Sequence, residues 1–501
     1  MKISPLDHAT LARGLLLLIL FVTVLRLDTL HNDFHWGYHN DEPSKVDQVK
    51  TGERNLRHPP LMLTLTNFVV NVGGFSNESQ RIVEVGRFLS ALSMGLALVL
   101  MADLLWVRIH PMAALGWACV APFHTGFFEV GHYFKEDSFF LLGIALVLRC
   151  SDFFLSKQSL AGALGLGLAL AFLAGTKYVG WLLVFFVVLQ LLLFSQASTT
   201  LKVKCLGAFT LGLILVYGPA LTRLDILQLF LKDEAGLLLS GDYGAGLQVP
   251  HGLYWKQLVD DFSLPLIVVG LSSYMVGVVI LKIRGYWLMP SVILTTMFLL
   301  AWTSKYSERY LLPVLLMVMA MIIAGPVLMV LVIFKKWPQL KFKSLALGLA
   351  VFVPSLFLFK DNVSDFTQCY EGFQKDSRKE LVQWVKTNLK SEQVVLAQDT
   401  LAKFYEPELS KKVWSSYFVA DLGTWEELRA LGVTHVIISF DVYHRYVNLK
   451  RQMKQQESAE FVRRRQFYLK ALSEGRVLWS SPNHNPKALH PGLKLIALNP
   501  E

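Results

Sequence analysis

Long apolar runs alternate with short polar connections over residues 1–359, and no comparable run follows them. The stretches 178–201 and 310–334, for example, contain no charged residue. Runs of roughly 18 or more apolar residues are typical of membrane-spanning helices. The pattern therefore predicts a polytopic α-helical membrane protein with about eleven spans, near residues 14–30, 88–107, 112–128, 138–155, 160–175, 178–194, 205–221, 264–281, 286–302, 310–334 and 344–359.

Composition and charge agree with this pattern. Apolar residues make up 53% and charged residues 17% of the 501 residues, whereas soluble domains have about 25% charged residues. The net charge of +10 comes largely from Lys and Arg in alternate short connections, which is typical of a membrane topology signal. We therefore expect the lipid bilayer, and no nucleic acid, among the partners.

The basic connections assign the two sides of the membrane. By the positive-inside rule, connections rich in Lys and Arg lie in the cytoplasm. The residues on this side are Lys2, Arg13, Arg108, Lys157, Lys202, Lys204, Lys282, Arg284, Lys335, Lys336, Lys341 and Lys343. An odd number of spans then places the C-terminal segment outside. We predict an integral protein of a bacterial inner (cell) membrane whose active site is extracytoplasmic.

Residues 360–501 form a second predicted domain after the transmembrane domain of residues 1–359. Short helices and strands alternate here, near 376–390, 394–398, 413–418, 425–431, 435–439 and 459–473. The apolar run Val436–Ile438 is typical of a buried parallel strand, and Thr424 with Glu427 forms a capping-box pattern. The sequence predicts a small extracytoplasmic α/β domain without a Gly-rich phosphate loop.

Charged side chains gather at four places on the predicted outer face. These groups are Asp41–Glu42, Glu136–Asp137, Lys177 and the segment Lys305–Tyr310. Ionisable groups at membrane depth are costly and often mark function. We therefore expect the four groups to converge around one cavity.

The two acidic pairs each allow a structural and a chemical interpretation. Asp41 and Glu42, followed by Pro43, suit a helix N-terminus, but a carboxylate at the membrane surface can also accept the proton of an attacking hydroxyl. Glu136 and Asp137 open a predicted helix, where acids interact favourably with the helix dipole. Both interpretations stay open for each pair.

The basic groups also each allow a structural and a chemical interpretation. Lys177 lies between two apolar spans and could extend its amine to the interface, yet its side of the membrane disfavours positive charge, which favours contact with an anion. Arg309 with Tyr310 is typical of an interfacial anchor, and Arg also suits phosphate.

No cofactor is certain from the sequence. A divalent metal stays possible because histidines are frequent near Asp41 and Glu42, although their spacing favours a structural role. These histidines are His31, His35, His39 and His58.

In order and in predicted side, these segments resemble the GT-C class of glycosyltransferases, and within it the protein O-mannosyltransferase (glycosyltransferase family 39) and aminoarabinose transferase group. That group has an early Asp-Glu pair, a [HK]-P-P-L segment, a further outer acid, a Lys between paired helices and an Arg-Tyr-x-x-Pro segment. The matching residues are Asp41–Glu42, His58-Pro59-Pro60-Leu61, Glu136–Asp137, Lys177 and Arg309–Pro313. Many relatives have Pro-Asp or Ala-Asp where Glu136 precedes Asp137, so which acid matters stays open.

The resemblance implies transfer of a hexose or pentose from a polyprenyl-phosphate donor to a hydroxyl of a glycan, lipid or protein acceptor, with inversion at the anomeric carbon. The implied site comprises a base with its supporting acid (Asp41, Glu42), a donor-phosphate group (Lys177, Arg309, Tyr310, Lys305), a second acidic site (Glu136, Asp137) and a positioning segment (His58, Pro59, Pro60).

Two other classes of function compete with transfer. A transporter or flippase of a lipid-linked sugar would also place charges in broken membrane helices, but the sequence shows no internal repeat and its charges lie at one face. A membrane receptor would account for the C-terminal domain and not for the clustered charges. Glycosyl transfer is therefore the predicted function.

Overall fold

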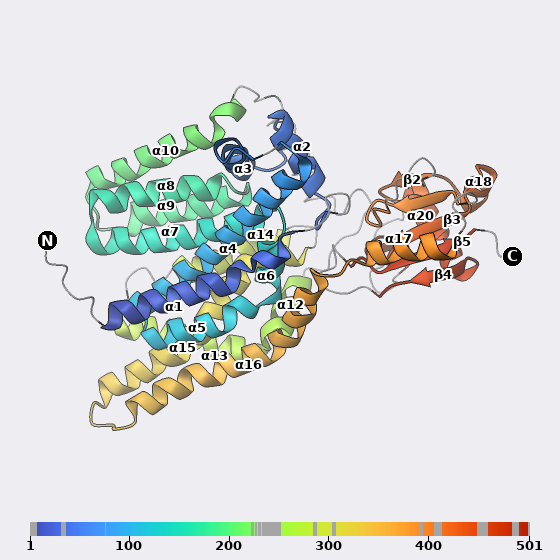
Figure 1. Ribbon diagram of the computed structural model, residues 1–501. Helices are drawn as coiled ribbons and strands as arrows, with labels where there is room; N and C mark the ends of the chain where they lie inside the picture. Colours follow the sequence, from blue (N-terminus) through green and yellow to red (C-terminus); the bar gives the residue numbers. More distant parts are fainter. Residues whose placement is uncertain are drawn as a thin grey trace. The chain divides into compact units, whose positions relative to one another are not determined.

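The computed structural model describes residues 8–31, 37–75, 77–221, 252–283, 288–302, 307–389, 394–404, 413–447, 459–482 and 490–498, with 225, 228 and 232 singly (Figure 1). Two compact units are present. We call them the helical unit (Met1–Leu30, Lys45–Ala235 and Pro250–Phe366) and the tail unit (His31–Ser44, Gly236–Val249 and Thr367–Glu501).

The segment with Asp41 and Glu42 belongs to the tail unit, although the predicted division at residue 359 places it with the membrane helices. The other boundary lies at Phe366, because the helix predicted at 344–359 continues to Gly372. Whether 1–359 and 360–501 are separate folding domains stays a prediction.

Every predicted span coincides with helical structure. The helices of this region are α1 (His8–Leu25), α2 (Glu42–Thr51), α3 (Leu61–Val72), α4 (Ser79–Arg108), α5 (Pro111–Val120), α6 (Thr125–Gly131), α7 (Asp137–Lys157), α8 (Leu160–Ala174), α9 (Val179–Phe194), α10 (Thr199–Leu221), α12 (Leu253–Phe262), α13 (Leu264–Leu281), α14 (Leu288–Trp302), α15 (Leu312–Lys336) and α16 (Lys343–Gly372). The predicted span 112–128 is divided into α5 and α6 by a short 3-10 turn that contains Pro122, which cannot continue the helical hydrogen bonds.

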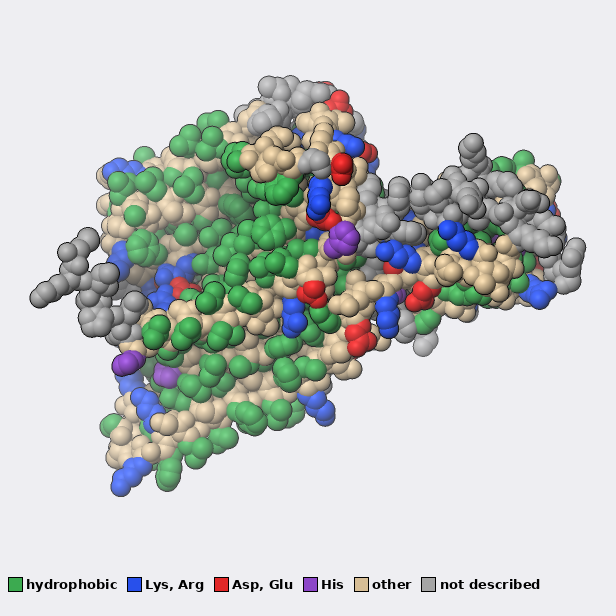
Figure 2. All heavy atoms as spheres, viewed as in Figure 1, with side chains coloured by type: hydrophobic (Ala, Val, Ile, Leu, Met, Phe, Trp, Pro, Cys, Tyr) green, Lys and Arg blue, Asp and Glu red, His purple; other side chains and the backbone are tan. Residues whose placement is uncertain are grey.

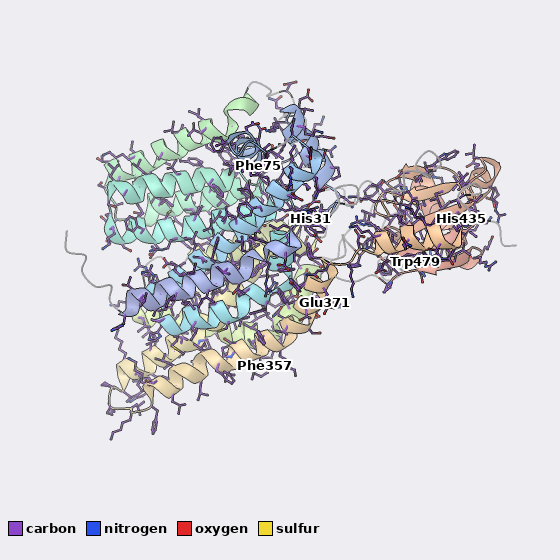
Figure 3. All side chains as sticks on the ribbon, in the orientation of Figure 1. His31, Phe75, Phe357, Glu371, His435 and Trp479 are labelled. Carbon is purple, nitrogen blue, oxygen red and sulfur yellow. The ribbon has the colours of Figure 1, made fainter. Side chains whose placement is uncertain are left out.

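Seven of the described helices are long and apolar enough to cross a membrane. Together with the small C-terminal sheet described below, they confirm the predicted fold class, whereas the number of eleven spans stays a prediction. Many large apolar side chains are exposed on the helices, and on the face shown in Figure 2 hydrophobic atoms are frequent over the helical region. Phe357 on α16, for example, is 54% exposed (Figure 3). Such a surface suits a lipid environment, so the chain is an integral membrane protein.

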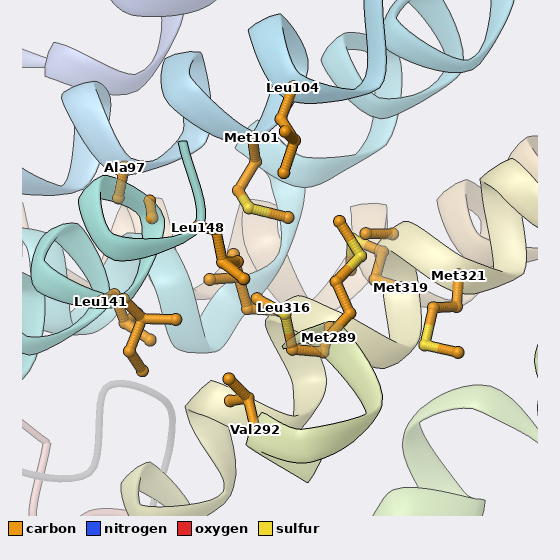
Figure 4. Packing of buried hydrophobic residues seen from close by; sticks show 14 of the residues in the cluster. Ala97, Met101, Leu104, Leu141, Leu148, Met289, Val292, Leu316, Met319 and Met321 are labelled. Carbon is orange, nitrogen blue, oxygen red and sulfur yellow. The ribbon is translucent and has the colours of Figure 1, made fainter. Parts of the chain in front are cut away.

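The centre of the helical unit is α15, which is buried almost continuously from Leu312 to Leu328. Its side chains pack with those of α4, α7 and α14 (Figure 4). On another side it contacts α13 through glycine: a Cβ at Gly325 would lie 2.4 Å from the Gly270 carbonyl oxygen. Small residues allow such close helix packing in membranes, so Gly325→Val would separate the two helices.

An ion-pair network ties α1, α4 and α7 together at their predicted cytoplasmic ends. Asp103 on α4 accepts hydrogen bonds from Arg13 and, at 2.8 Å, from Arg149 Nε. Arg149 also contacts Asp152 at 3.2 Å, and Asp152 pairs with Arg108. Buried charges are tolerated when they are paired, so two of the basic residues that predict topology, Arg13 and Arg108, also have a structural role.

The tail unit contains a five-stranded sheet in the order β2-β1-β3-β5-β4. Its elements are α17 (Ser377–Asn388), β1 (Leu396–Asp399), β2 (Val413–Ser416), α18 (Trp425–Ala430), β3 (His435–Ser439), α19 (Phe440–Val447), α20 (Ala459–Ser473), β4 (Arg476–Ser480) and β5 (Leu493–Ala497). The strand β3, which contains Val436–Ile438, pairs in parallel with β1, as its apolar run predicts, and β1 also pairs in parallel with β2. The capping box at Thr424 is present. The antiparallel strands β4 and β5 were not predicted.

Candidate functional site

Three of the four predicted groups meet at the start of α7 in the helical unit. Glu136 and Asp137 are both 2% exposed there. Glu136 occupies the N-cap position of α7, but its side chain accepts no capping hydrogen bond. The carboxylates instead face side chains from other segments, so helix capping does not explain Glu136.

Glu136 is held by α2 and by the segment before α3. Lys45 on α2 donates to Glu136 Oε2 and, at 3.2 Å, to the carbonyl oxygen of Phe134. His58 Nε2 lies 3.1 Å from Glu136 Oε1. Burial alone would raise the pKa of Glu136, but the facing His58 and Lys45 side chains lower it well below its usual range. The carboxylate is therefore ionised at neutral pH.

Asp137 pairs with Lys177, from the turn between α8 and α9. The Lys177 amine lies 5.6 Å from the ring centre of Tyr310 and 5.8 Å from that of Phe140. Arg309, whose guanidinium lies 5.6 Å from the Tyr310 ring centre, acts electrostatically on Asp137. The structure thus gathers the predicted second acidic site with three of the four predicted phosphate-binding residues.

Local sequence explains how these side chains are presented. Pro59 and Pro60 directly precede α3, where a missing backbone N–H costs little, and so they fix the approach of His58. After α8 the Thr176 hydroxyl donates to the Leu173 carbonyl oxygen at 2.7 Å. The next residue, Lys177, is only 13% exposed, so it is not a lysine that merely extends to the interface.

Asp41 and Glu42 lie in the tail unit at the start of α2. Glu42 is fully buried, and its Oε2 accepts a hydrogen bond of 2.7 Å from the backbone N–H of Tyr38. The Asp41 side chain is 44% exposed, and its Oδ2 lies 3.5 Å from His39 Nδ1. Asp41 is therefore accessible to a substrate, and Glu42 is a structural neighbour.

Two predictions about this site remain untested. Lys305 lies outside the described residues, and the placement of Asp41 relative to Lys177 and Arg309 stays a prediction. Within the described part of the chain, no group of three His, Cys, Asp or Glu side chains could hold a metal ion. His35, one of the histidines near Asp41 and Glu42, lies outside the described residues, so a divalent metal at that place stays a prediction.

Sequence reasoning missed Lys45, the buried partner of Glu136. We expect Lys45→Met to destabilise the protein by about 3–5 kcal/mol, because a buried carboxylate then loses its cation. The midpoint of thermal unfolding of the purified protein would measure this. Lys50→Met is the matched control, since Lys50 is an exposed lysine of the same helix. Equal midpoints for the two variants would contradict the role of Lys45.

Comparison with known proteins gives a likeness in structure and none in sequence. No protein-family model and no curated protein matches the chain. The solved structure of ArnT from Cupriavidus metallidurans bound to undecaprenyl phosphate is similar over 98% of this chain and 99% of that chain, with a TM-score of 0.51 and 12% sequence identity.

Two further structures are similar at lower scores. The Pmt1-Pmt2 protein O-mannosyltransferase complex of S. cerevisiae bound to the sugar donor has a TM-score of 0.33 and 20% identity, over 49% of this chain and 36% of that chain. The other is the oligosaccharyltransferase AglB of Archaeoglobus fulgidus in complex with an inhibitory peptide and a dolichol-phosphate. It has a TM-score of 0.48 and 11% identity, over 88% of this chain and 71% of that chain. The ArnT comparison confirms the predicted resemblance to GT-C glycosyltransferases at the level of the fold.

Proposed function

We propose that this protein is a membrane glycosyltransferase that moves a sugar from a polyprenyl-phosphate donor to an acceptor hydroxyl. The observation that carries the proposal is the group of Lys177, Asp137, Tyr310 and Arg309, in which two partly buried cations adjoin a buried carboxylate at the end of apolar helices. The fold adds support, because the ArnT structure with the same fold is bound to undecaprenyl phosphate.

The cations bind the donor phosphate in this proposal. A phosphate monoester is a weakly basic leaving group, so the departing lipid phosphate needs no general acid. It needs electrostatic stabilisation of the negative charge that develops on it. Lys177 supplies this charge, with Arg309 as a second cation suited to phosphate and Tyr310 beside both. We assign Lys305 an assisting role from the sequence.

Asp137 keeps the Lys177 amine in place and leaves its second carboxylate oxygen for the sugar. The Oδ2 atom of Asp137 is buried and makes no hydrogen bond within the described residues. Buried polar atoms are rarely left without a partner, so a hydroxyl of the donor sugar would be a suitable donor to it. This second carboxylate oxygen favours Asp137 as the acid that contacts the substrate. Glu136, whose carboxylate contacts Lys45 and His58, would then hold α2 and His58 in place.

Asp41 is the base. Its carboxylate takes the proton from the acceptor hydroxyl, whose oxygen forms a bond to the anomeric carbon of the sugar. The bond from that carbon to the phosphate oxygen breaks, and its electron pair stays on the released polyprenyl phosphate. A single displacement of this kind inverts the anomeric configuration. We place the reaction on the outer face of a bacterial inner membrane, with a glycan, lipid or protein as acceptor.

A proteoliposome experiment separates this proposal from a flippase. The purified full-length chain is reconstituted with polyprenyl-phosphate donors whose hexose or pentose is radiolabelled, together with candidate acceptors. Transfer releases one polyprenyl phosphate for each labelled acceptor. Movement of intact donor between the bilayer leaflets, without cleavage in any combination, would contradict transfer and favour the flippase.

A further inference from the structure

An amine of the tail unit lies beside the Asp41–Glu42 pair. Lys403 follows β1, more than 350 positions after this pair along the chain. Its Nζ atom is buried and makes no hydrogen bond within the described residues. The charged groups that act on it are Arg378, Glu42, Asp41 and Asp376. A buried ammonium group is costly unless anions compensate it, and the carboxylates are the compensating charges.

Gly37 shows how closely these groups approach one another. A Cβ at Gly37 would lie 3.3 Å from Glu42 Oε2 and 3.7 Å from Lys403 Nζ. The backbone of Gly37 has φ +55°, and its carbonyl oxygen accepts a 2.9 Å hydrogen bond from Arg378 Nη2. The Glu42 carboxylate and the Lys403 amine therefore both border the space that a side chain at position 37 would fill.

The surroundings of this space are held by contacts within the tail unit. Arg378 binds Asp376 through two hydrogen bonds, of 2.8 and 2.7 Å. The Tyr38 ring packs edge-on against Phe373 with centres 5.0 Å apart. These contacts orient the segment around Gly37, so the charge of Lys403 acts at a fixed place.

The backbone of Lys403 adds a second, independent observation. Its φ is +41°, in the left-handed region that residues other than Gly adopt infrequently. Such conformations persist where surrounding structure enforces them, and they are frequent at functional sites. Burial, together with Arg378, lowers the pKa of Lys403 to about 8, while Glu42 and Asp41 oppose that shift. The amine is therefore mostly protonated at neutral pH.

We propose that Lys403 is a positioning residue for the transfer reaction: its ammonium group fixes the Asp41–Glu42 segment and keeps the Asp41 carboxylate ionised. This inference rests on the proposed function. Glu42 is buried and anchors the segment, whereas Asp41 is accessible to the acceptor. Among the described residues, His39 Nδ1 lies 3.5 Å from the Asp41 carboxylate, and Lys403 and Asp41 act on each other electrostatically.

Three variants of the full-length protein test the proposal. Lys403→Met removes the charge at similar length, and we expect the kcat of sugar transfer to fall about 10–100-fold, as for other partners that orient a reacting group. The KM for the donor stays unchanged. Lys403→Arg keeps the charge and restores most of the rate. Lys375→Met is the matched control, an exposed lysine of the same unit, and it behaves as the wild type.

The pH dependence distinguishes positioning from a merely structural role. The wild-type rate falls as pH rises through about 8, where Lys403 loses its proton, but the Lys403→Arg rate does not, because Arg stays protonated. At low pH the rate falls as the Asp41 carboxylate becomes protonated. In Lys403→Met this fall occurs about one pH unit higher, since the nearby positive charge that favours the ionised carboxylate is lost. An unchanged kcat in Lys403→Met, or equal pH profiles for wild type and Lys403→Arg, would overturn the proposal. If Lys403→Met does not fold, the comparison of the pH profiles of Lys403→Arg and wild type tests the proposal by itself.

A readout without catalysis separates this proposal from the proposed function. The lysines are dimethylated with ¹³C, and the Lys403 resonance, assigned by its absence in Lys403→Arg, is titrated in wild type and in Glu42→Gln. The midpoint moves to lower pH in the variant, because a carboxylate that favours the protonated amine is lost. An unmoved midpoint would contradict the charge contact even in an active enzyme. A moved midpoint in a protein without transfer would contradict only the enzymatic function.

Discussion

Asp41→Asn protein is expected to bind the lipid-linked donor normally and to transfer its sugar about 10²–10⁴-fold more slowly than the wild type, the usual contribution of a general base. Asn has nearly the same size and hydrogen-bonding capacity as Asp but cannot accept the proton of the acceptor hydroxyl. Donor binding survives because the phosphate is held by Lys177 and Arg309. Transfer from a polyprenyl-phosphate donor and donor binding are measured on the same sample.

The control for this variant is Asp47→Asn, an exposed acid on the same helix, which should keep the wild-type rate. Undiminished transfer by Asp41→Asn would remove Asp41 from the chemistry. Loss of binding together with transfer would give Asp41 a structural role only. The combination of bound donor and absent transfer is specific to a base.

Lys177→Met is expected to lose transfer by about 10²–10³-fold, the usual cost of removing one group that stabilises developing charge. Unlike Asp41→Asn, this variant should also bind the donor more weakly, because the bound phosphate loses its cation and meets the unpaired carboxylate of Asp137. Isothermal titration with polyprenyl phosphate, which lacks the sugar, isolates the phosphate contact.

The double variant Lys177→Met with Asp137→Asn separates binding from folding. Lys177→Met alone leaves the buried Asp137 carboxylate without its cation and so lowers the stability of the fold. The double variant removes both charges of the pair, so its stability should return toward that of the wild type while its affinity for phosphate stays low. Lys256→Met, an exposed lysine on α12, is the matched control for a general loss of positive charge. Unchanged phosphate affinity in Lys177→Met would contradict the assignment of the donor site.

The sequence predicts those parts of the fold that depend on local pattern. Each membrane helix has its own apolar run, and the three parallel-paired strands of the tail have apolar segments, so both are visible without any knowledge of distant contacts. The edge strand β4 has mostly exposed or half-exposed positions, and it therefore shows no clear apolar pattern. Only the start of α2 is indicated by the sequence, where Asp41, Glu42 and Pro43 suit a helix N-terminus. The rest of α2 has no apolar pattern, because most of its residues are polar or charged.

The sequence predicts which residues belong to the site, but it does not predict which of their side chains contact one another. Charges at helix ends identify Glu136, Asp137 and Lys177 as a group, since all three stand at the same predicted membrane face. The partner of Glu136 is Lys45, 91 residues earlier, and nothing local marks that lysine among many. Lys403 is hidden for the same reason: only the fold of the tail unit brings its amine to Asp41 and Glu42.

The anomeric configuration of the product tests the central claim, direct displacement by an acceptor hydroxyl that Asp41 has deprotonated. Nuclear magnetic resonance of the glycosylated acceptor, made from a donor of known configuration and analysed before any spontaneous change, reports it directly. We expect inversion, because a single displacement attacks the anomeric carbon from the face opposite the departing phosphate. Retention would require a covalent glycosyl-enzyme intermediate and a second displacement, and would contradict the assignment of Asp41 as a base.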